Sequence, residues 1–394
     1  MDNCVIPHGY KATALGIIPQ EWEVMLLGNL SNSISSGRNK HRDAHGQYPV
    51  FGSTGIIGYS STYEYEGPVI LVARVGANAG TLNFASGQYD VSDNTLIITI
   101  KQNVYDYNFA YNQLTHYKLN KLVFGSGQPL ITSKQLKNIR IPVPPLAEQR
   151  KIAEVLGVWD KAIEKQARLI EKLALRKRGL MQRLLSAKLR LPGFSKPWKK
   201  VKLGDICERV TRKNIEDNQN VMTISAQRGF VAQTDFFNKS VASVTLESYY
   251  LVFRDEFCYN KSYSNGYPMG AIKRLSEAEK AVVTSLYICF NVKPETDVNI
   301  DYLSYYFDNG GLNRGLTKIA KEGGRAHGLL NVTPKDFFGL SFEIPSLKEQ
   351  TAIAEVLTAA DREIELAKEK LERLHRQKRG LMQQLLSGKK RVKN

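Results

Sequence analysis

Residues 148–156 read EQRKIAEVL and residues 349–357 read EQTAIAEVL, and this repeated stretch decides the fold. The match extends without gaps from 144–190 to 345–391, with an offset of 201 residues (349 − 148). It ends in two nearly identical tails, KRGLMQRLLS at 177–186 and KRGLMQQLLS at 378–387. A match of this length indicates that one structural unit is duplicated within the chain.

Each copy of the repeat has the pattern of one long helix. Largely apolar residues recur at alternating steps of four and three, which is typical of a coiled-coil seam. In the first copy these are Ile152, Leu156, Trp159, Ile163, Gln166, Ile170, Leu173, Lys177, Leu180 and Leu184, and in the second Ile353, Leu357, Ala360, Ile364, Ala367, Leu371, Leu374, Lys378, Leu381 and Leu385. A proline precedes each run, and Ser-Ala or Ser-Gly follows it, which predicts where the helices begin and end. Each helix is expected to have ~40 residues and a length of ~60 Å.

A second, fainter repeat opens each half of the chain. WEVMLLG at 22–28 resembles WKKVKLG at 198–204, with an offset of 176 (198 − 22). The second variable region is therefore 25 residues longer (201 − 176). Short runs at 68–75, 94–100, 281–290 and 340–344 predict strands bounded by turns, so each variable region is expected to be a mixed α/β domain. The fold class expected is α+β, with two such domains in a pseudo-twofold arrangement.

The predicted organisation has five parts. An N-terminal arm (1–22) precedes the first domain (23–143), and the central helix follows (144–190). A linker with the second domain (191–344) and the C-terminal helix (345–394) complete the chain. The segment LPGFSKP at 191–197 joins the two halves.

The composition indicates a polyanionic partner. The chain has 55 Lys and Arg residues against 38 Asp and Glu residues, a formal charge of +17, which favours nucleic acid over a membrane surface. Its four cysteines have no CxxC or Cys/His ligand spacing, which argues against a zinc site or a disulfide scaffold. No secretory signal or membrane-spanning run is visible, so a cytoplasmic location is expected.

Several motifs resemble the specificity subunit of type I restriction–modification systems. PPLAEQRKIAEVL and its twin SLKEQTAIAEVL, with the paired tails, are similar to the conserved regions of that family. GQYPVFGSTGIIGYS (46–60), VARVGANAG (72–80) and GSGQPLITSKQLKNIRIPVPPLAEQ (125–149) are similar to its target-recognition domains.

The resemblance implies a non-catalytic, DNA-binding subunit of a DNA methylation and restriction complex. Each recognition domain would read one half of a bipartite site in double-stranded DNA. Two long antiparallel coiled-coil helices would space the domains and dock two methyltransferase subunits, to which restriction subunits are added. No cofactor is expected in this chain, because S-adenosylmethionine would lie in the methyltransferase, and ATP and Mg in the restriction subunit. Candidate partner-binding residues on the helices are Ile152, Leu156, Gly179, Leu180, Leu184, Ile353, Leu357, Gly380, Leu381 and Leu385.

Candidate DNA contacts lie in polar, glycine-containing segments, where Arg, Lys, Asn and Gln can reach base edges or phosphates. In the first half they are Arg38, Asn39, Lys40, His41, Arg42, Ser53, Thr54, Arg74, Ser126 and Gln128. In the second half they are Arg212, Lys213, Gln227, Arg228, Lys261, Ser262, Tyr263, Arg325 and His327. For each segment the alternative is a solvated charge run or an ordinary turn.

Two other functions stay open at this point. One is a self-contained DNA methyltransferase or nuclease, which the sequence disfavours because it has no Walker motif, no methyltransferase Pro-Pro-aromatic motif and no GxGxxG loop. The other is a coiled-coil assembly adaptor that does not read bases. No catalytic residue and no metal ligand is predicted.

Overall fold

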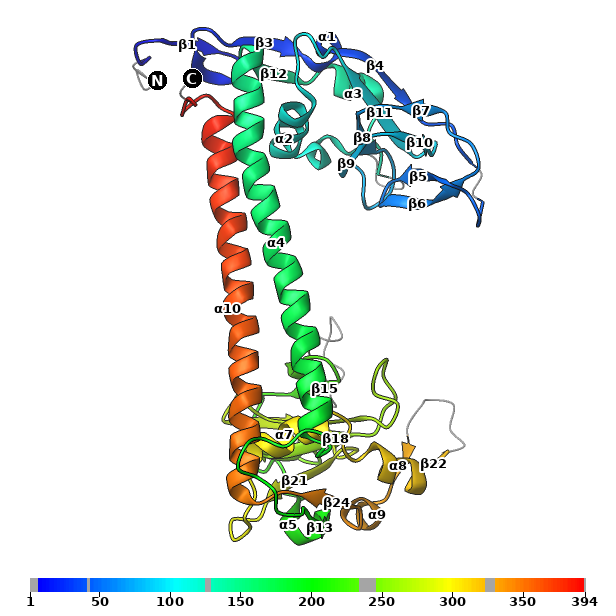
Figure 1. The fold of residues 1–394 in the computed structure, drawn as a ribbon, viewed down its shortest axis with the longest axis vertical. Coiled ribbons are helices and arrows are strands. Elements are labelled where there is room, and N and C mark those ends of the chain that lie inside the picture. Colours follow the sequence, from blue (N-terminus) through cyan, green and yellow to red (C-terminus); the bar gives the residue numbers. More distant parts are fainter. Residues whose placement is uncertain (1–5, 41–42, 125–128, 234–245, 323–329, 393–394) are drawn as a thin grey trace. The chain divides into compact units, whose positions relative to one another are not determined.

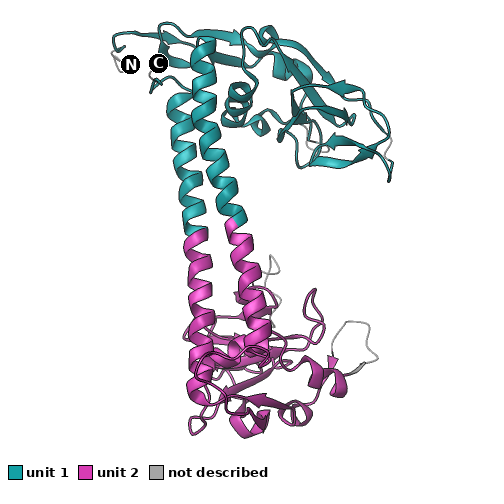
Figure 2. Ribbon diagram, viewed as in Figure 1, with its two compact units in different colours: residues 1–168, 368–394 teal, residues 169–367 magenta. Residues whose placement is uncertain are grey.

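A computed structural model describes residues 6–40, 43–124, 129–233, 246–322 and 330–392 of the chain. The chain forms two compact units (Figure 2), unit 1 from residues 1–168 and 368–394 and unit 2 from residues 169–367. Because the division falls inside both repeat copies, each unit takes helical residues from both of them.

Two helices of 39 residues, α4 (Leu146–Leu184) and α10 (Leu347–Leu385), carry the repeat (Figure 1). In unit 1 the Lys378 ammonium donates to Asp160, and in unit 2 the Lys177 ammonium donates to Asp361. These are the same pair with the two copies exchanged (160 + 201 = 361; 177 + 201 = 378). An early position of one helix meets a late position of the other in both units, so the paired segments are antiparallel, as predicted.

The predicted seam is confirmed. Every seam position in both helices is buried or half-buried, whereas the positions between them carry most of the exposed charge. Ile152 and Leu156 are fully buried in unit 1 against Leu385 and Leu386. The equivalent residues of the exchanged copies form the core of unit 2.

Unit 1 contains two four-stranded sheets, ordered β4-β11-β8-β9 and β6-β5-β10-β7, and two strand pairs, β1-β2 and β3-β12. The strands are β1 (Tyr10–Thr13), β2 (Gly16–Pro19), β3 (Glu23–Leu26), β4 (Ser31–Ser36), β5 (Tyr48–Gly52), β6 (Gly55–Ser60), β7 (Tyr65–Glu66), β8 (Val69–Ala73), β9 (Leu82–Ala85), β10 (Gln88–Val91), β11 (Thr95–Ile100) and β12 (Arg140–Val143). The short helices are α1 (Leu27–Leu30), α2 (Tyr107–Tyr117), the 3-10 turn η1 (Leu119–Leu122) and α3 (Ser133–Lys137).

Unit 2 contains one four-stranded sheet, ordered β14-β21-β18-β19, and the strand pairs β13-β24, β15-β16, β17-β20 and β22-β23. The strands are β13 (Lys199–Lys202), β14 (Cys207–Val210), β15 (Met222–Ser225), β16 (Gly229–Ala232), β17 (Tyr250–Phe253), β18 (Phe257–Asn260), β19 (Ala271–Arg274), β20 (Lys280–Val283), β21 (Ile288–Val292), β22 (Lys321–Glu322), β23 (Leu330–Asn331) and β24 (Ser341–Ile344). The helices are α5 (Leu203–Ile206), α7 (Ile300–Asp308), α8 (Asn313–Ile319) and α9 (Pro334–Phe338).

The two units share part of their topology although their sequences have diverged. In each, a strand and a one-turn helix (β3 and α1, or β13 and α5) lead into the edge strand of a four-stranded antiparallel sheet, β4 or β14. The third strand in the order is β8 or β18, and a capped helix, α2 or α7, follows the sheet. Two mixed α/β domains with a long helix pair are therefore confirmed. One strand prediction is wrong in detail: 281–290 is not a single strand, because residues 284–287 turn between β20 and β21.

The repeated Glu148 binds the tail of the other repeat copy. In unit 1 its carboxylate accepts from Nε and Nη2 of Arg391, at 2.6 and 2.9 Å, and from Nε1 of Trp22 at 3.1 Å. In unit 2 the Glu349 carboxylate accepts from Nε and Nη2 of Arg190, at 2.6 and 2.8 Å. Both carboxylates are buried, so each needs its arginine for charge compensation.

The repeated glutamine next to it attaches the globular domain to the helix. Gln149 accepts from the backbone N–H of Asp106, the N-cap of α2, and donates to the carbonyls of Val104 and Pro144. Gln350 makes the same three bonds in unit 2, to Asn299, Asp297 and Pro345. The Glu-Gln dipeptide therefore joins three parts in each unit: the start of one long helix, the tail that follows the other, and the N-terminus of α2 or α7.

Candidate nucleic-acid interface

In the sheets ordered β4-β11-β8-β9 and β14-β21-β18-β19, the third strand ends directly at a cation. Arg74 follows β8 and Lys261 follows β18. The carbonyl of Arg74 accepts from the backbone N–H of Ile131 at 2.9 Å, and that of Lys261 accepts from the N–H of Leu330 at 3.1 Å. The two cations thus occupy equivalent places, each tied to the segment that leads to the last short helix of its unit.

Arg74 lies against the loop that follows β4. Its Nη1 donates to the hydroxyl of Ser36 at 3.2 Å, and its buried Nε has no acceptor among the described residues. A buried donor without a partner costs about 1–3 kcal/mol, and an acceptor on a bound ligand would remove that cost. Next to it, Gly37 passes so close to β10 that an added Cβ would lie 2.4 Å from the carbonyl oxygen of Val91, so the loop depends on glycine here.

The neighbouring candidate DNA contacts of unit 1 differ in whether another side chain already binds them. Arg38 and Lys40 are exposed, and within the described part of the chain the ion pair of Arg38 is a long one, 3.7 Å to Glu64. Asn39 is held, because its amide donates to the Asp90 carboxylate. Ser53 and Thr54 form the two-residue turn between β5 and β6, on a sheet whose strand β10 also contacts Asn39.

In unit 2 the loop after β18 meets the turn between β15 and β16. The amide of Gln227, in that turn, donates to the carbonyl of Asn265 at 3.2 Å. Tyr263 in the loop is 65% exposed, and the N–H of Ser262 is bound by the Asn260 side chain. Burial lowers the pKa of Lys261 from its usual value, and no described carboxylate pairs with it. The structure therefore brings together Gln227, Lys261, Ser262 and Tyr263.

Of the remaining candidate DNA contacts in unit 2, some already make contacts within the domain. Arg228 is exposed in the same turn as Gln227. Arg212 is used inside the domain, because both its Nη atoms bind the buried Glu256, at 3.1 and 3.2 Å, and its guanidinium stacks 3.8 Å from the Phe253 ring. Lys213 donates to the carbonyl of Ser248 and lies over a tyrosine ring, Tyr250. These contacts leave Arg228 as the freer cation.

Six predicted contacts lie outside the described residues: His41, Arg42, Ser126, Gln128, Arg325 and His327. Within the described part, no group of three or more His, Cys, Asp or Glu side chains is placed to hold a metal ion. No helix of that part is apolar over enough length to span a membrane.

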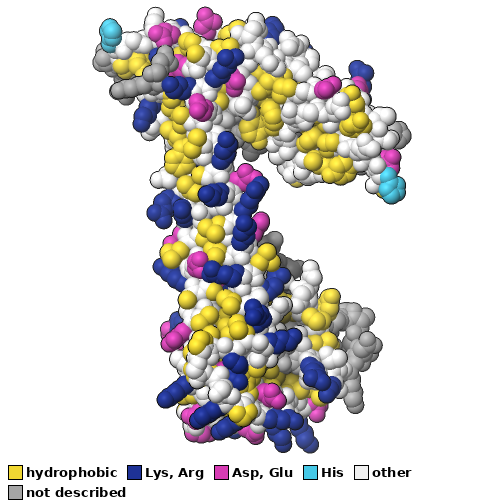
Figure 3. Space-filling view, in the orientation of Figure 1, with side chains coloured by type: hydrophobic (Ala, Val, Ile, Leu, Met, Phe, Trp, Pro, Cys, Tyr) yellow, Lys and Arg dark blue, Asp and Glu magenta, His cyan; other side chains and the backbone are white. Residues whose placement is uncertain are grey.

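Two glycines recur at the same place in the two helices. Their recurrence predicts a close helix approach or a bend where a partner helix docks, and a Cβ added at Gly179 or Gly380 meets no described atom within 4 Å. Close packing within the chain is therefore not the reason for them. Figure 3 shows Lys and Arg side chains along the helices with Asp and Glu interspersed, as expected for a solvated face.

Comparison with known proteins identifies the family. The type I restriction modification DNA specificity domain matches residues 19–174 and 195–376, one copy in each half. The chain belongs to this family. It is a specificity subunit, a non-catalytic component of a type I restriction–modification system, with two target-recognition domains.

Relatives and solved structures agree along nearly the whole length. The putative type I restriction enzyme MjaX specificity subunit of Methanocaldococcus jannaschii is 26% identical, and the alignment covers 98% of this chain and 97% of that protein. The MjaVIII specificity subunit of the same organism is 24% identical over 96% and 95% of the two chains. The type I S subunit of M. genitalium has this fold, with a TM-score of 0.57 at 17% identity over 92% of this chain and 96% of that one.

Sequence reasoning missed the equivalence of Arg74 and Lys261. No sequence signal relates them, because residues 29–130 and 205–331 share little that can be aligned. Only their position at the ends of β8 and β18 makes them a pair.

Proposed function

We propose that the two recognition domains each read one half of an asymmetric bipartite site in double-stranded DNA. The observation that carries this proposal is the pair Arg74 and Lys261. Each follows the third strand of the equivalent four-stranded sheet of its own unit. Both lack a carboxylate partner among the described residues. A phosphate or a base edge would satisfy such a cation.

The loops around the two cations differ, which supports two different half-sites. Arg74 is next to Ser36 and the exposed Arg38, whereas Lys261 is next to Tyr263 and the Gln227 turn. Arginine favours guanine, glutamine favours adenine, and an exposed tyrosine can contact sugar or base. Distinct donor sets at equivalent places produce an asymmetric site.

The helix pair spaces the two domains and docks two adenine-methyltransferase subunits, and restriction subunits join that complex. S-adenosylmethionine is bound by the methyltransferase, and ATP and Mg by the restriction subunit. The complex acts in the cytoplasm. Gly179 and Gly380, one in each repeat copy with open space at the Cβ position, are consistent with two identical partner subunits.

Adenine methylation mapping tests the reading function. DNA from a host that carries this chain and its methyltransferase is expected to show one bipartite adenine motif. With that motif as the probe, Arg74→Ala is expected to weaken binding by about 1–3 kcal/mol through one half-site, and Lys261→Ala through the other. If either cation contacts only phosphate, its variant weakens all sequences equally and lowers the salt slope by about 1.

Matched controls are Lys101→Ala in unit 1 and Lys335→Ala in unit 2, because both are exposed lysines of the same units. They are expected to leave half-site preference unchanged. Salt-insensitive binding by the assembled complex, or methylation without a bipartite motif, would contradict the proposal. Inserting one helical turn into 150–175 should change the gap between half-sites and leave their bases unchanged.

A further inference from the structure

One concave surface occurs twice, once in each unit, and is lined by the same three elements. Groove 1 lies between the end of α10 (Leu386, Ser387), strand β12 and the end of α2. Groove 2 lies between the end of α4 (Leu185, Ser186), strand β24 and the end of α7. The helix-end residues are related by the repeat offset of 201, as are β12 and β24. The two grooves are therefore equivalent products of the duplication.

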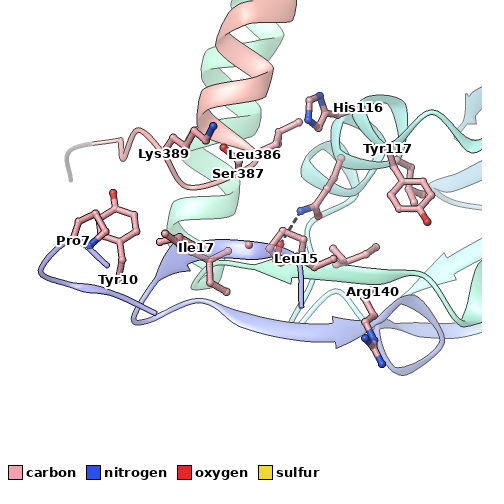
Figure 4. Close-up of a pocket in the computed structure, with 16 residues that line it drawn as sticks. Pro7, Tyr10, Leu15, Ile17, His116, Tyr117, Arg140, Leu386, Ser387 and Lys389 are labelled. Carbon is pink, nitrogen blue, oxygen red and sulfur yellow. Dashed lines mark hydrogen bonds between the residues drawn. The ribbon is translucent and has the colours of Figure 1, made fainter. Parts of the chain in front are cut away.

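Groove 1 has an apolar floor and a basic edge, and its volume is about 790 Å³. Figure 4 shows Leu15 and Ile17 of the β1–β2 hairpin facing Leu386 and Ser387 of the helix end. Leu15 is 42% exposed although it is a large apolar side chain. Lys389 and Arg140 are exposed lining residues, and neither pairs with a carboxylate of the described chain; Lys389 lies beside the helix end, whereas the Arg140 side chain points away from it (Figure 4).

Groove 2 also combines an apolar lining with exposed cations, but from different residues, and its volume is about 600 Å³. Trp198, Leu312 and Phe342 are among its apolar lining. Arg314 and Lys318, one turn apart on α8, are exposed and have no ion pair in the described chain. The groove also has one carboxylate, Glu343, which is outnumbered by the cations.

We propose that each groove receives the same apolar, acidic segment of a methyltransferase subunit, so that one chain binds two copies. This inference rests on the proposed docking function and gives it a location. Two equivalent grooves need two equivalent occupants, which a pair of identical subunits supplies. An apolar floor with a charged edge has the anatomy of a protein-interface centre.

The charge of the grooves decides among possible occupants. A duplex surface has no apolar segment that would fill the floor, so DNA does not fit. A second copy of this chain carries +17 overall and would bring cations against cations. An acidic segment satisfies the unpaired cations of both edges and adds electrostatic attraction during association.

Native mass measurement of the complex tests the inference without DNA. The full chain is co-purified with its methyltransferase subunit as wild type, as Arg140→Glu with Lys389→Glu, as Arg314→Glu with Lys318→Glu, and with all four changes. Each double variant is expected to weaken one of the two sites at least about tenfold and to shift the 2:1 complex to 1:1. The quadruple variant is expected to leave the chain free.

The matched control is Lys101→Glu with Lys335→Glu, one exposed cation of each unit that lines neither groove. It should keep the 2:1 complex. A photo-crosslinking phenylalanine in place of Leu15 gives a second measurement that does not depend on charge reversal, and it should crosslink to an apolar, acidic methyltransferase peptide.

The outcomes separate this inference from the proposed function. If all groove variants keep two methyltransferase copies and Leu15 gives no crosslink, the grooves are not the docking sites, although docking itself stands. If the wild-type chain recruits no methyltransferase, the docking function fails and this inference fails with it. A loss caused equally by the control pair would also overturn the groove assignment.

Discussion

Trp22 in unit 1 and Trp198 in unit 2 are equivalent residues, but only one of them has a hydrogen-bond partner. The indole N–H of Trp22 donates to Glu148, and the Trp22 side chain is fully buried. The indole nitrogen of Trp198 is buried without an acceptor among the described residues, and the ring lies 5.8 Å from the Arg190 guanidinium. Among the described residues, the buried carboxylate of unit 1 therefore has two donor residues, Arg391 and Trp22, and that of unit 2 has one, Arg190.

This difference shows which contacts of the repeat are kept in both units and which are not. The arginine–glutamate pair and the glutamine clamp are the same in both units, whereas the tryptophan contact differs. In unit 1 the hydrogen bonds that Arg391 donates to Glu148, and to a lesser extent to Glu21, hold the pKa of Arg391 above its usual range. The arginine–glutamate pair and the glutamine hydrogen bonds, which both units share, hold the helices and the domain together. The tryptophan hydrogen bond, which differs, determines how much stability each unit loses when its arginine is removed.

The largest expected effect is on the unit with one donor. Arg190→Ala leaves Glu349 buried and uncompensated, so unit 2 should lose about 3–5 kcal/mol. Arg391→Ala should cost unit 1 less, because Trp22 still donates to Glu148. Hydrogen exchange along each unit during denaturant titration measures the two losses separately. In a Trp22→Phe background the two arginine variants should become equal, and a persistent difference would contradict this account.

The next effect should be equal in the two units. Gln149→Ala and Gln350→Ala each remove three hydrogen bonds and should each cost about 3 kcal/mol, at about 1 kcal/mol per bond. Gln149→Glu and Gln350→Glu place a carboxylate oxygen against two carbonyl oxygens in a buried site, so each should cost more than the alanine variant. Thermal or denaturant unfolding read by hydrogen exchange checks this, and a twofold difference between the units would show that the clamps are not equivalent.

The helices could be predicted from the sequence because their apolar period and their repetition are both local signals. Their bounds and seam follow from the prolines and the spacing of Ile152, Leu156 and their counterparts. The exchange of tails between copies could not be predicted, because nothing in the spacing says which helix end Glu148 meets. The pairing is decided by tertiary packing of Arg391 against a carboxylate 243 positions away.

The candidate site was predicted less completely. Polar loops could be found from their composition, but composition does not show which side chains are already engaged. Arg212 resembles a free DNA contact in sequence, yet Glu256 holds it inside the domain. Cys258 and Cys289 look scattered, yet their sulfurs lie 3.3 Å apart on neighbouring strands. Such pairings depend on strand register, which the sequence alone does not give.

A smaller difference lies beside the helices. Tyr305 in unit 2 donates to the Asp361 carboxylate at 2.8 Å and lies near Thr358. The corresponding residues of unit 1 are Asn112 and Gly157, and a polar concavity of about 590 Å³ is present there. Tyr305→Asn should therefore place the unit 1 side chain in unit 2. It should lower the free energy of unfolding of unit 2 by about 1–2 kcal/mol, because one hydrogen bond and part of the packing of the tyrosine ring are lost. Tyr305→Phe, which keeps the ring, should cost about half as much in the same unfolding measurement.

The smallest effect separates folding from docking at three helix glycines. Gly157, Gly179 and Gly380 all have open space at the Cβ position within the described chain, so alanine at each should stabilise its unit by about 0.5–1 kcal/mol. Only Gly179 and Gly380 recur at the same place in both copies, since Thr358 replaces the counterpart of Gly157. Leucine at Gly179 and Gly380 should therefore weaken methyltransferase binding and leave DNA sequence preference unchanged, whereas Gly157→Leu should affect neither. Equal losses of methyltransferase from all three variants, measured by native mass, would mean that the recurrence of the two glycines has no connection with partner binding.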